Sequence, residues 1–342
     1  IAALVYAFPS RRMIVIGVTG TKGKTSTANF IWAGLTSGGH KTGIITTANT
    51  RIGESEFLNP YHMTMPSPFV IQKLLAQMVR ENCHYAVVET TSEGLKQYRH
   101  FGIFYDIAVF TNLTPAHLPS HHDSFEEYTL TKGKMFAALF SHQKVIGGKK
   151  IEKVIIANRE SAHASFFLNF PADKKITFGA QEVEKLKQDS NFKLSILGEF
   201  NLMNAMPAII ISRLAGIPDN LIAEGLVNLK TIPGRMEEIR EGQVYTVLVD
   251  YAHEKESITL VLASAQKLKH NNGRVIILLG AEGGGRDKAK RPIMGELSAR
   301  MADYVIVTNV DPYEDDPKEI LEDIACAAEK FGKIREKDLF VI

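Results

Sequence analysis

The chain has 342 residues, of which 45% are apolar and 23% are charged, and its formal net charge is +2. This length and composition predict one large or two smaller globular domains, and the weak charge excludes a general basic surface for nucleic acid or an anionic membrane. Two cysteines are too few for a disulfide framework, so we expect a reducing, cytoplasmic location.

Short β-branched runs alternate with helical patterns along the chain. Strands are predicted at residues 13–19, 84–89, 106–112, 153–158, 246–251, 274–280 and 303–309. Helices are predicted at residues 25–37, 68–81, 125–140, 202–215 and 256–270. Several strands are apolar from end to end, as in parallel sheets that are buried on both faces. The alternation predicts an α/β fold, with a P-loop ATPase-like, mostly parallel sheet domain followed by a Rossmann-like α/β C-terminal domain.

The clearest domain boundary is the stretch KTIPGRMEEI, where Pro233 and Gly234 follow a helix and precede a new set of strands. We therefore predict an N-terminal remnant at residues 1–12, a central ATP-binding domain at 13–232 and a C-terminal domain at 233–342. The apolar opening IAALVYAF is too short to span a bilayer and lacks the features of a signal peptide. Because the chain starts on Ile1 and stops at DLFVI, which reads as the middle of a strand, we expect a fragment.

The stretch GVTGTKGKTSTANF has the features of a phosphate-binding loop between a strand and a helix. Its glycines let the backbone aim N–H groups at an anion, and the helix beginning near Lys24 adds the positive end of its dipole. Lys24 can reach the β- and γ-phosphates, and the Thr25 hydroxyl can bind Mg²⁺. The loop is a variant, because the usual spacing needs glycine where Val18 stands. The predicted ATP-binding residues of the loop are Gly20, Thr21, Lys22, Gly23, Lys24, Thr25 and Ser26.

Phosphoryl transfer also needs an acidic group near the bound Mg²⁺. Glu89 ends the strand HYAVVE and fits this role, although a strand-end surface carboxylate is the alternative. The three histidines of AHLPSHHDSF follow no zinc spacing, which favours a single histidine beside Mg²⁺. Lys132 lies one turn after Tyr128 on the next predicted helix, and by itself it reads as a solvated lysine.

These residues together resemble the Mur ligases, ATP-dependent amide-forming enzymes of peptidoglycan precursor synthesis. TGTKGKTS looks like the family's ATP loop, and VVETTSEGLKQYR, FTNLTPAHL and SFEEYTLTK are similar to blocks of the type that adds the third peptide residue. LGEFNLMNAMPA, PGRMEEI, VDYAHEKESI, GGGRDKAKRPIMG and TNVDPYEDDP follow in the family's order. The resemblance covers nearly the whole chain, and many ordered motifs are more specific than any one of them.

The resemblance implies roles for individual residues. Lys132 matches a lysine that is carbamylated by CO₂ and so becomes a carboxylate-like ligand of a second Mg²⁺. The implied catalytic residues are Lys24, Glu89, His117 and Lys132, and the implied ligands of the two Mg²⁺ ions are Thr25, Glu89, His117 and carbamylated Lys132. Further implied ATP contacts are Asn201, Asn204, Arg235, Asp250 and His253. Implied contacts of the acyl and amino-acid substrates are Thr64, Thr91, Ser92, Arg99, Asp311 and Tyr313, and a cationic cluster follows at Arg286, Lys288, Lys290 and Arg291.

The implied reaction has two steps. The carboxylate of a UDP-N-acetylmuramoyl dipeptide attacks the γ-phosphate of ATP, which gives an acyl phosphate and ADP. The amine of an amino acid then displaces phosphate and forms an amide. The implied partners are these small molecules, without nucleic acid or membrane insertion, and we expect a monomer.

Three motifs depart from the family's pattern. The family's D-H-L-D-x-H reads AHLPSH at residues 116–121, and the two lost aspartates could orient the metal histidine. The histidine of the E-x-S-S-H block is Glu93 here. The D-N-P-R motif that holds the distal carboxylate of diaminopimelate reads VDPY, so the arginine clamp is absent and we expect lysine instead. Asp315 and Asp316 could favour an amine-bearing side chain, or they could cap the following helix.

The family's N-terminal domain, which holds the UDP moiety, is expected to be missing here, because only twelve residues precede Met13. The end of the C-terminal domain is expected to be missing as well. Such a chain could be a fragment of an active enzyme or a member of a subfamily with a shortened front.

Other functions remain open at this stage. A folylpolyglutamate synthase or another amide ligase of the same fold is the main alternative, although ETTSEGLKQYR favours the muropeptide type. A non-catalytic ATP-binding homologue would explain the lost aspartates, but Lys24, Glu89, His117 and Lys132 are retained. A dinucleotide-dependent oxidoreductase is disfavoured, because GAEGGGR fails the G-x-G-x-x-G spacing at its end.

Overall fold

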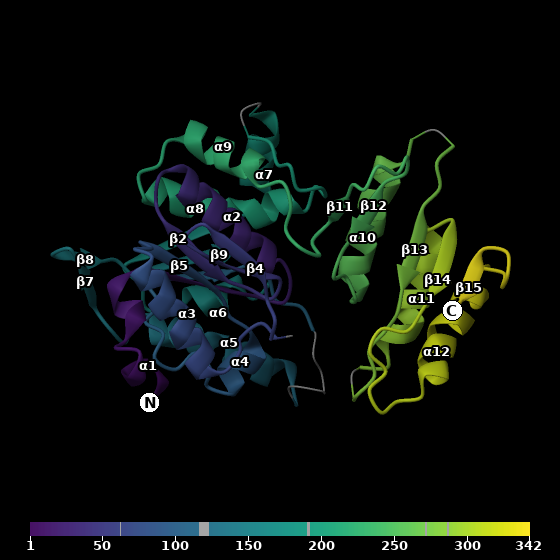
Figure 1. The fold of residues 1–342 in the computed structure, drawn as a ribbon, viewed down its shortest axis with the longest axis horizontal. Coiled ribbons are helices and arrows are strands. Elements are labelled where there is room, and N and C mark those ends of the chain that lie inside the picture. Colours follow the sequence, from purple (N-terminus) through teal and green to yellow (C-terminus); the bar gives the residue numbers. More distant parts are fainter. Residues whose placement is uncertain (62, 116–122, 190–191, 271, 286) are drawn as a thin grey trace. The chain divides into compact units, whose positions relative to one another are not determined.

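The computed structural model describes residues 1–61, 63–115, 123–189, 192–270, 272–285 and 287–342 (Figure 1). They form two compact units, one consisting of Ser124–Val249 and the described residues before position 116, the other mainly of Asp250–Ile342. Among the helices of these residues, none combines the length and the apolar character needed to cross a membrane.

An eight-stranded sheet forms the centre of the first unit, in the order β10-β9-β6-β1-β5-β2-β3-β4. Neighbours from β10 to β2 are parallel, whereas β3 pairs antiparallel with both β2 and β4. The strands are β1 (Ile14–Thr19), β2 (Thr42–Ile45), β3 (Asn49–Ile52), β4 (Ser55–Leu58), β5 (Tyr85–Glu89), β6 (Ile107–Phe110), β9 (Val154–Asn158) and β10 (Lys174–Phe178). Because the central strands are parallel, the loops that follow β1, β5 and β6 meet at one edge of the sheet.

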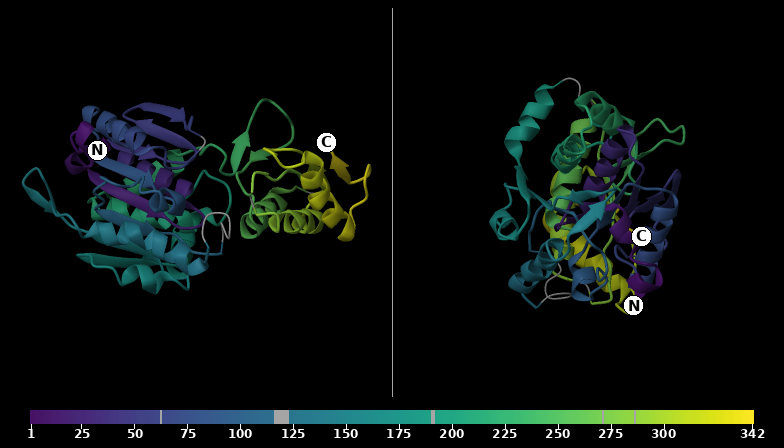
Figure 2. Two further views of the ribbon diagram at one scale, coloured as in Figure 1. Left: turned by 90° about the horizontal axis from the view of Figure 1, so that it is seen from below. Right: turned by 90° about the vertical axis from the view of Figure 1, so that its left-hand side faces the viewer.

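Helices cover both faces of this sheet (Figures 1 and 2). Val15 and Ile16, which are neighbours in β1, point into different cores, as the alternation of side chains along a strand requires. One core lies under α2 (Lys24–Ser37), α8 (Asn201–Leu214) and α9 (Asp219–Asn228), and the other under α3 (Pro68–Arg80), α5 (Phe125–Leu139) and α6 (Ala164–Leu168). The remaining helices are α1 (Ala2–Val5), η1 (Pro9–Arg12), α4 (Ser92–Lys96) and α7 (Ala180–Gln188).

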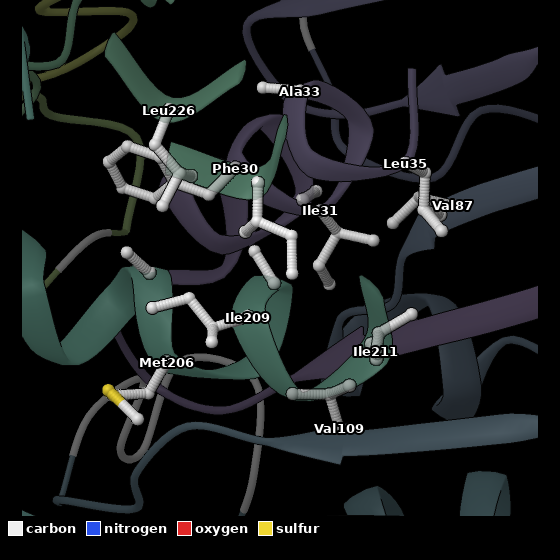
Figure 3. Packing of buried hydrophobic residues seen from close by; sticks show 14 of the residues in the cluster. Phe30, Ile31, Ala33, Leu35, Val87, Val109, Met206, Ile209, Ile211 and Leu226 are labelled. Carbon is white, nitrogen blue, oxygen red and sulfur yellow. The ribbon is translucent and has the colours of Figure 1, made fainter. Parts of the chain in front are cut away.

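The core beneath α2 holds that helix, and the loop before it, at the carboxyl end of β1. Figure 3 shows Phe30 and Ile31 of α2 with Ile209 of α8 and Val109 of β6. All four side chains are fully buried, and each contributes about 1.5–3 kcal/mol of transfer free energy. The same core contains Leu226 of α9, so three helices and the sheet share it.

Two short antiparallel pairs complete the first unit. β7 (Lys144–Ile146) and β8 (Lys149–Ile151) form a hairpin that projects from this unit in Figure 1 and in the left-hand view of Figure 2. β12 (Val247–Val249) pairs with β11 (Glu237–Ile239), and its residues are half-buried or exposed. The apolar run at 246–251 therefore does not form a parallel strand covered on both faces, because its partner is a neighbouring polar segment.

The second unit is a smaller parallel α/β structure. Its sheet has the order β13-β14-β15, formed by β13 (Ile276–Leu279), β14 (Tyr304–Val307) and β15 (Leu339–Val341). Its helices are α10 (Lys255–Leu268), α11 (Lys290–Met301) and α12 (Pro317–Lys330). Val305, Val307, Ile324 and Leu339 form the centre of its core. The predicted fold class, a mostly parallel α/β sheet domain followed by a second α/β domain, is confirmed.

Candidate active site

The phosphate loop connects β1 to α2 and is shaped by its two glycines. Gly20 and Gly23 have φ angles of +151° and +80°, which other residues rarely adopt. A Cβ on Gly20 would come within 2.0 Å of the Thr111 hydroxyl, and one on Gly23 within 2.3 Å of the Asn204 side-chain oxygen. Glycine is therefore needed at both positions, for conformation and for space.

Lys24, the first residue of α2, folds its side chain back over this loop. Its ammonium group donates to the carbonyls of Thr21, at 2.8 Å, and Gly20, at 3.2 Å. Burial lowers the pKa of Lys24, while the charge of Glu89 acts in the opposite direction. A positive charge held on neutral carbonyls at a helix N-terminus is suited to binding a phosphate group.

Glu89 ends β5 and is 2% exposed, so the alternative of a surface carboxylate is wrong. Its Oε2 accepts hydrogen bonds from the Thr25 hydroxyl at 2.8 Å and from the backbone N–H of Thr47 at 2.9 Å. Its Oε1 accepts from the Thr47 hydroxyl at 3.0 Å. Arg235 donates from Nη2 to the Thr25 oxygen at 3.1 Å. A buried carboxylate beside a hydroxyl is the oxygen donor set that Mg²⁺ prefers, so these residues fit that ion.

Lys132 of α5 lies on the other side of the same loop. It is 1% exposed, so the interpretation from spacing alone, a solvated helix lysine, is wrong. Its ammonium donates to the carbonyl of Gly20 at 2.9 Å and lies 4.6 Å from the centre of the Tyr128 ring. Burial, and then the charge of Lys24, hold the pKa of Lys132 well below its ordinary value. The amine is thus placed where its neutral form is favoured.

The start of α8 lies against the phosphate loop. Asn204 contacts the position where a Gly23 side chain would be, and its Nδ2 donates to the Asn201 Oδ1 at 2.9 Å. Asn201 in turn donates to the carbonyl of Leu197 at 2.7 Å. The fold therefore brings the two predicted adenine-side asparagines next to the loop, although they are about 180 residues away along the chain.

The residues that the resemblance assigns to the acyl substrate lie in the same unit. The Thr64 and Thr47 hydroxyls are 2.7 Å apart. Arg99 donates to the carbonyl of Met65 at 2.6 Å. Thr91 caps α4, since its hydroxyl accepts from the N–H of Gly94 at 3.2 Å, and Ser92 begins that helix and is buried.

The remaining predicted ATP contacts lie in loops of the second unit. Asp250 accepts from the N–H of Ala252 at 2.8 Å, and the His253 Nδ1 lies 2.9 Å from the carbonyl of Tyr251. His117 and Arg286, as well as the departures at 116 and 119, fall outside the described residues.

The loop after β14 carries the predicted amino-acid contacts. Asp311 and Tyr313 are exposed, and Tyr313 has a φ of +51°. Asp316 accepts from the N–H of Lys318 at 2.9 Å, so the helix-capping alternative is confirmed for this residue. Asp315 is instead bonded to Arg291 at 3.1 Å. Neither aspartate is left as the simple amine-binding carboxylate that the sequence suggested.

The residues of the predicted cationic cluster differ in their burial and in their partners. Arg291 is 1% exposed and bonded to Asp323 as well as Asp315, whereas Lys288 forms an exposed pair with Glu319 at 2.9 Å. Arg291 is therefore part of the framework that holds the loop after β14.

Comparison with known proteins places the chain in a family. Residues 18–212 match the Mur ligase middle domain, and residues 234–339 match the Mur ligase, glutamate ligase domain. The chain belongs to the Mur ligase family. A UDP-N-acetylmuramyl-tripeptide synthetase of Roseiflexus sp. is 34% identical over 97% of this chain and 69% of its own length. A UDP-N-acetylmuramoyl-L-alanyl-D-glutamate--2,6-diaminopimelate ligase of Geobacillus thermodenitrificans is 34% identical over 93% and 67%.

Solved structures give the same fold. A UDP-N-acetylmuramoyl-L-alanyl-D-glutamate--2,6-diaminopimelate ligase aligns with a TM-score of 0.60 and 26% identity, over 97% of this chain and 68% of the other. Mycobacterium tuberculosis folylpolyglutamate synthase, complexed with ADP and AMPPCP, aligns with a TM-score of 0.70 and 17% identity, over 100% and 84%. The second likeness shows the fold alone. The predicted family and reaction class are confirmed: this Mur ligase is an ATP-binding, ADP-forming acid–amino-acid ligase.

Sequence reasoning missed one polar residue of the site, Thr47. It binds both oxygens of Glu89, yet it lies 42 positions earlier in the chain. The signal was present in IITTANT, where hydroxyl side chains directly follow an apolar run. Its meaning depends on β2 lying next to β5, and that strand order is not readable from the sequence.

Proposed function

We propose that this Mur ligase joins an amino acid to a UDP-N-acetylmuramoyl dipeptide, with conversion of ATP to ADP and phosphate, in peptidoglycan precursor synthesis. The observation that carries the proposal is the arrangement around the phosphate loop. Lys24 and Lys132 both donate to the carbonyl of Gly20, and the buried Glu89 bonds to the Thr25 hydroxyl. Relatives at 34% identity bear the names of ligases that act on this class of substrate.

Two Mg²⁺ ions complete the proposed site. Thr25 and Glu89 would hold the first, and Glu89, His117 and carbamylated Lys132 the second. Bound Mg²⁺ offsets the repulsion between the phosphates and the substrate carboxylate, two anions that must meet. The lowered pKa of Lys132 supports the carbamate, because only a neutral amine can add CO₂. That addition forms an N–C bond and releases one proton, which turns the neutral amine into an anionic carbamate.

The proposed chemistry has two displacements. A carboxylate oxygen of the dipeptide bonds to the γ-phosphorus, the bond to the β–γ bridging oxygen breaks, and ADP leaves. The neutral amine of the amino acid then bonds to the acyl carbon, phosphate leaves, and the nitrogen loses a proton. Lys24 serves to hold the β- and γ-phosphates in line for the first displacement.

The other predicted contacts are proposed as they stand. ATP is bound by Gly20, Thr21, Lys22, Gly23, Lys24, Thr25, Ser26, Asn201, Asn204, Arg235, Asp250 and His253. The substrates are bound by Thr64, Thr91, Ser92, Arg99, Asp311 and Tyr313. We propose lysine as the amino acid, because Tyr313 stands where a diaminopimelate enzyme has its arginine. We further propose domains at 13–232 and 233–342, a monomeric state and a cytoplasmic location.

Phosphate release from ATP tests the proposal. The purified protein is given UDP-N-acetylmuramoyl-L-alanyl-D-glutamate with lysine, diaminopimelate or glutamate in turn, and separately a reduced folate with glutamate. We expect release only with the muropeptide and lysine, together with a product heavier by one lysyl residue. Release with the folate would support the alternative ligase. Binding of an ATP analogue without release in any mixture would support a non-catalytic homologue.

A further inference from the structure

Thr47, in the turn between β2 and β3, connects two groups of different proposed function. Its hydroxyl lies 3.0 Å from Oε1 of Glu89 and 2.7 Å from the hydroxyl of Thr64. Glu89 is the proposed metal carboxylate, and Thr64 is a proposed contact of the acyl substrate. One oxygen atom therefore lies between the two parts of the site.

The chemistry of these groups fixes the direction of the hydrogen bonds. An ionised carboxylate only accepts, and a threonine hydroxyl has one proton to give. The Thr47 proton therefore points to Glu89, and Thr47 must accept the proton of Thr64. Thr64 is left with lone pairs for further contacts, which suits an N–H or O–H group of a substrate rather than a carboxylate.

A second contact holds the two segments together. The side-chain nitrogen of Asn59 donates to the carbonyl of Thr46 at 2.9 Å and to the carbonyl of Met63 at 2.9 Å. These carbonyls precede Thr47 and Thr64 in the chain. The backbone on both sides is thus fixed independently of the hydroxyl pair, so that pair is held in register rather than formed by chance.

The turn itself does not need the Thr47 hydroxyl. Thr46 closes it, since its hydroxyl donates to the carbonyl of Asn49 at 2.8 Å and accepts from the N–H of Asn49 at 2.9 Å. Asn49 also exchanges hydrogen bonds with Asn29 of α2, at 3.0 and 3.1 Å, and Asn29 donates to the carbonyl of Thr25. The turn is therefore anchored to the metal-site helix by residues other than Thr47.

We propose that Thr47 is a positioning residue that couples the metal carboxylate Glu89 to the acyl-substrate segment at Thr64. The proposal rests on the proposed function of Glu89 and Thr64. Loss of the hydroxyl should disturb both at once, because the carboxylate loses a donor and Thr64 loses its acceptor. A purely structural role would instead change stability and leave both binding steps as they are.

Thr47→Val tests this, since it keeps the shape and the backbone N–H bond to Glu89 but removes the hydroxyl. Two quantities are measured: the Mg²⁺ concentration at half-maximal binding of a non-hydrolysable ATP analogue, and the KM for the muropeptide. We expect both to rise by roughly tenfold, the scale of a hydrogen bond to a charged group. Thr47→Ser, which restores the hydroxyl, should recover most of each.

Two further variants separate the arms. Thr64→Val should raise the muropeptide KM while leaving the Mg²⁺ midpoint unchanged, because Thr64 does not bond to Glu89. Thr42→Val, the same replacement at the opposite end of β2, should change neither quantity, since its hydroxyl bonds to the carbonyl of His40. Thermal unfolding of each variant shows whether it is folded.

The outcomes are distinct. Coupled shifts in Thr47→Val with recovery in Thr47→Ser support the proposal. A shift in only one quantity, or shifts that serine does not recover, would overturn it. If the wild-type protein shows no muropeptide-dependent phosphate release, the proposed function fails, whereas the Mg²⁺ titration of analogue binding still tests the arm between Thr47 and Glu89.

Discussion

The two ends of the parallel strands in the first unit both bury lysines, but they satisfy them in different ways. At the amino ends, Asp106 accepts from Lys144 and, at 2.8 Å, from Lys153, and all three side chains are buried. At the carboxyl ends, Lys24 and Lys132 donate to backbone carbonyls of the phosphate loop. The first arrangement pairs its charges within the protein, and the second places two lysine amines on neutral backbone carbonyls.

This difference separates a structural use of buried charge from a functional one. The Lys153 ammonium also donates to the carbonyl of Tyr105 at 2.8 Å, and Asp106 accepts from the N–H of Val15 at 2.9 Å. The paired cluster therefore also bonds to the backbone at the amino ends of the strands. Burial lowers the pKa of Lys24 and of Lys132, and it also lowers that of Lys144 to about 8, but among the described residues only Lys144 is bonded to a carboxylate, that of Asp106. Holding such groups costs stability in the free protein, which is common at sites that bind anions.

The largest expected effect is on turnover at the carboxyl edge. Lys132→Ala should reduce kcat by a factor on the order of 10² to 10³, because the carbamate that would bind Mg²⁺ cannot form. Formate or acetate at millimolar concentration should restore part of the rate by replacing that carboxylate. Lys134→Ala, two positions along α5, is the matched control and should keep the wild-type rate. Normal activity without added carboxylate would refute the role of Lys132.

At the amino edge we expect an effect on stability instead. Lys153→Met leaves Asp106 buried with one of its two ammonium partners missing, which should lower the free energy of unfolding by about 3–5 kcal/mol. Urea unfolding followed by circular dichroism measures this loss. Lys150→Met, an exposed lysine of β8, is the control and should change it by less than about 0.5 kcal/mol. A small loss in Lys153→Met would mean that the pairing contributes little.

The same replacement should have the opposite sign at the carboxyl edge. Lys132→Met removes a buried amine to which, among the described residues, no carboxylate is bonded, and Gly20 retains Lys24 as a donor. We expect the free energy of unfolding, measured without ATP, to rise, because burying this amine has a desolvation cost that an apolar methionine does not have. A loss of stability comparable to that of Lys153→Met would erase the distinction between the two edges.

The phosphate loop and the burial of Lys132 can both be predicted from local sequence signals. The strand, loop and helix around Gly20–Thr25 are predictable, because an apolar β-branched run, two glycines and a helical pattern are all local signals. The burial of Lys132 could also be inferred from the spacing of its neighbours. Tyr128, Lys132 and Phe136 recur every four residues, so the lysine shares a face with two aromatic side chains that are fully buried.

The polar contacts between distant segments were not predictable. Thr47 meets Glu89 only because β2 pairs with β5, and Lys144 meets Asp106 although 37 residues separate them. Such contacts follow from strand order and from the packing of turns, which a single sequence does not encode locally. The segment of β12 shows the same limit, since the sequence predicts a strand there but not its short antiparallel pairing.

His100 is a third kind of buried base, and it gives the smallest expected effect. It is 8% exposed, and its Nδ1 has no hydrogen-bond partner among the described residues. Burial, with the charge of Lys134 adding to it, lowers its pKa to about 4, so the ring is neutral in the folded protein. As the pH falls below about 6.5, the unfolded chain takes up a proton that the folded protein does not. Stability should therefore decrease from pH 7 to pH 5 by about 2 kcal/mol on account of this residue.

His100→Phe isolates this contribution, because it fills a similar volume with a ring that cannot take up a proton. The difference in unfolding free energy between the variant and the wild type should shift in favour of the variant by about 2 kcal/mol between pH 7 and pH 5. His142→Phe, at an exposed position, should show no such shift. A pH-independent difference for His100→Phe would mean that the ring takes up its proton at the same pH in the folded and the unfolded protein. In that case burial of this ring would not be enough to keep it neutral at pH 5.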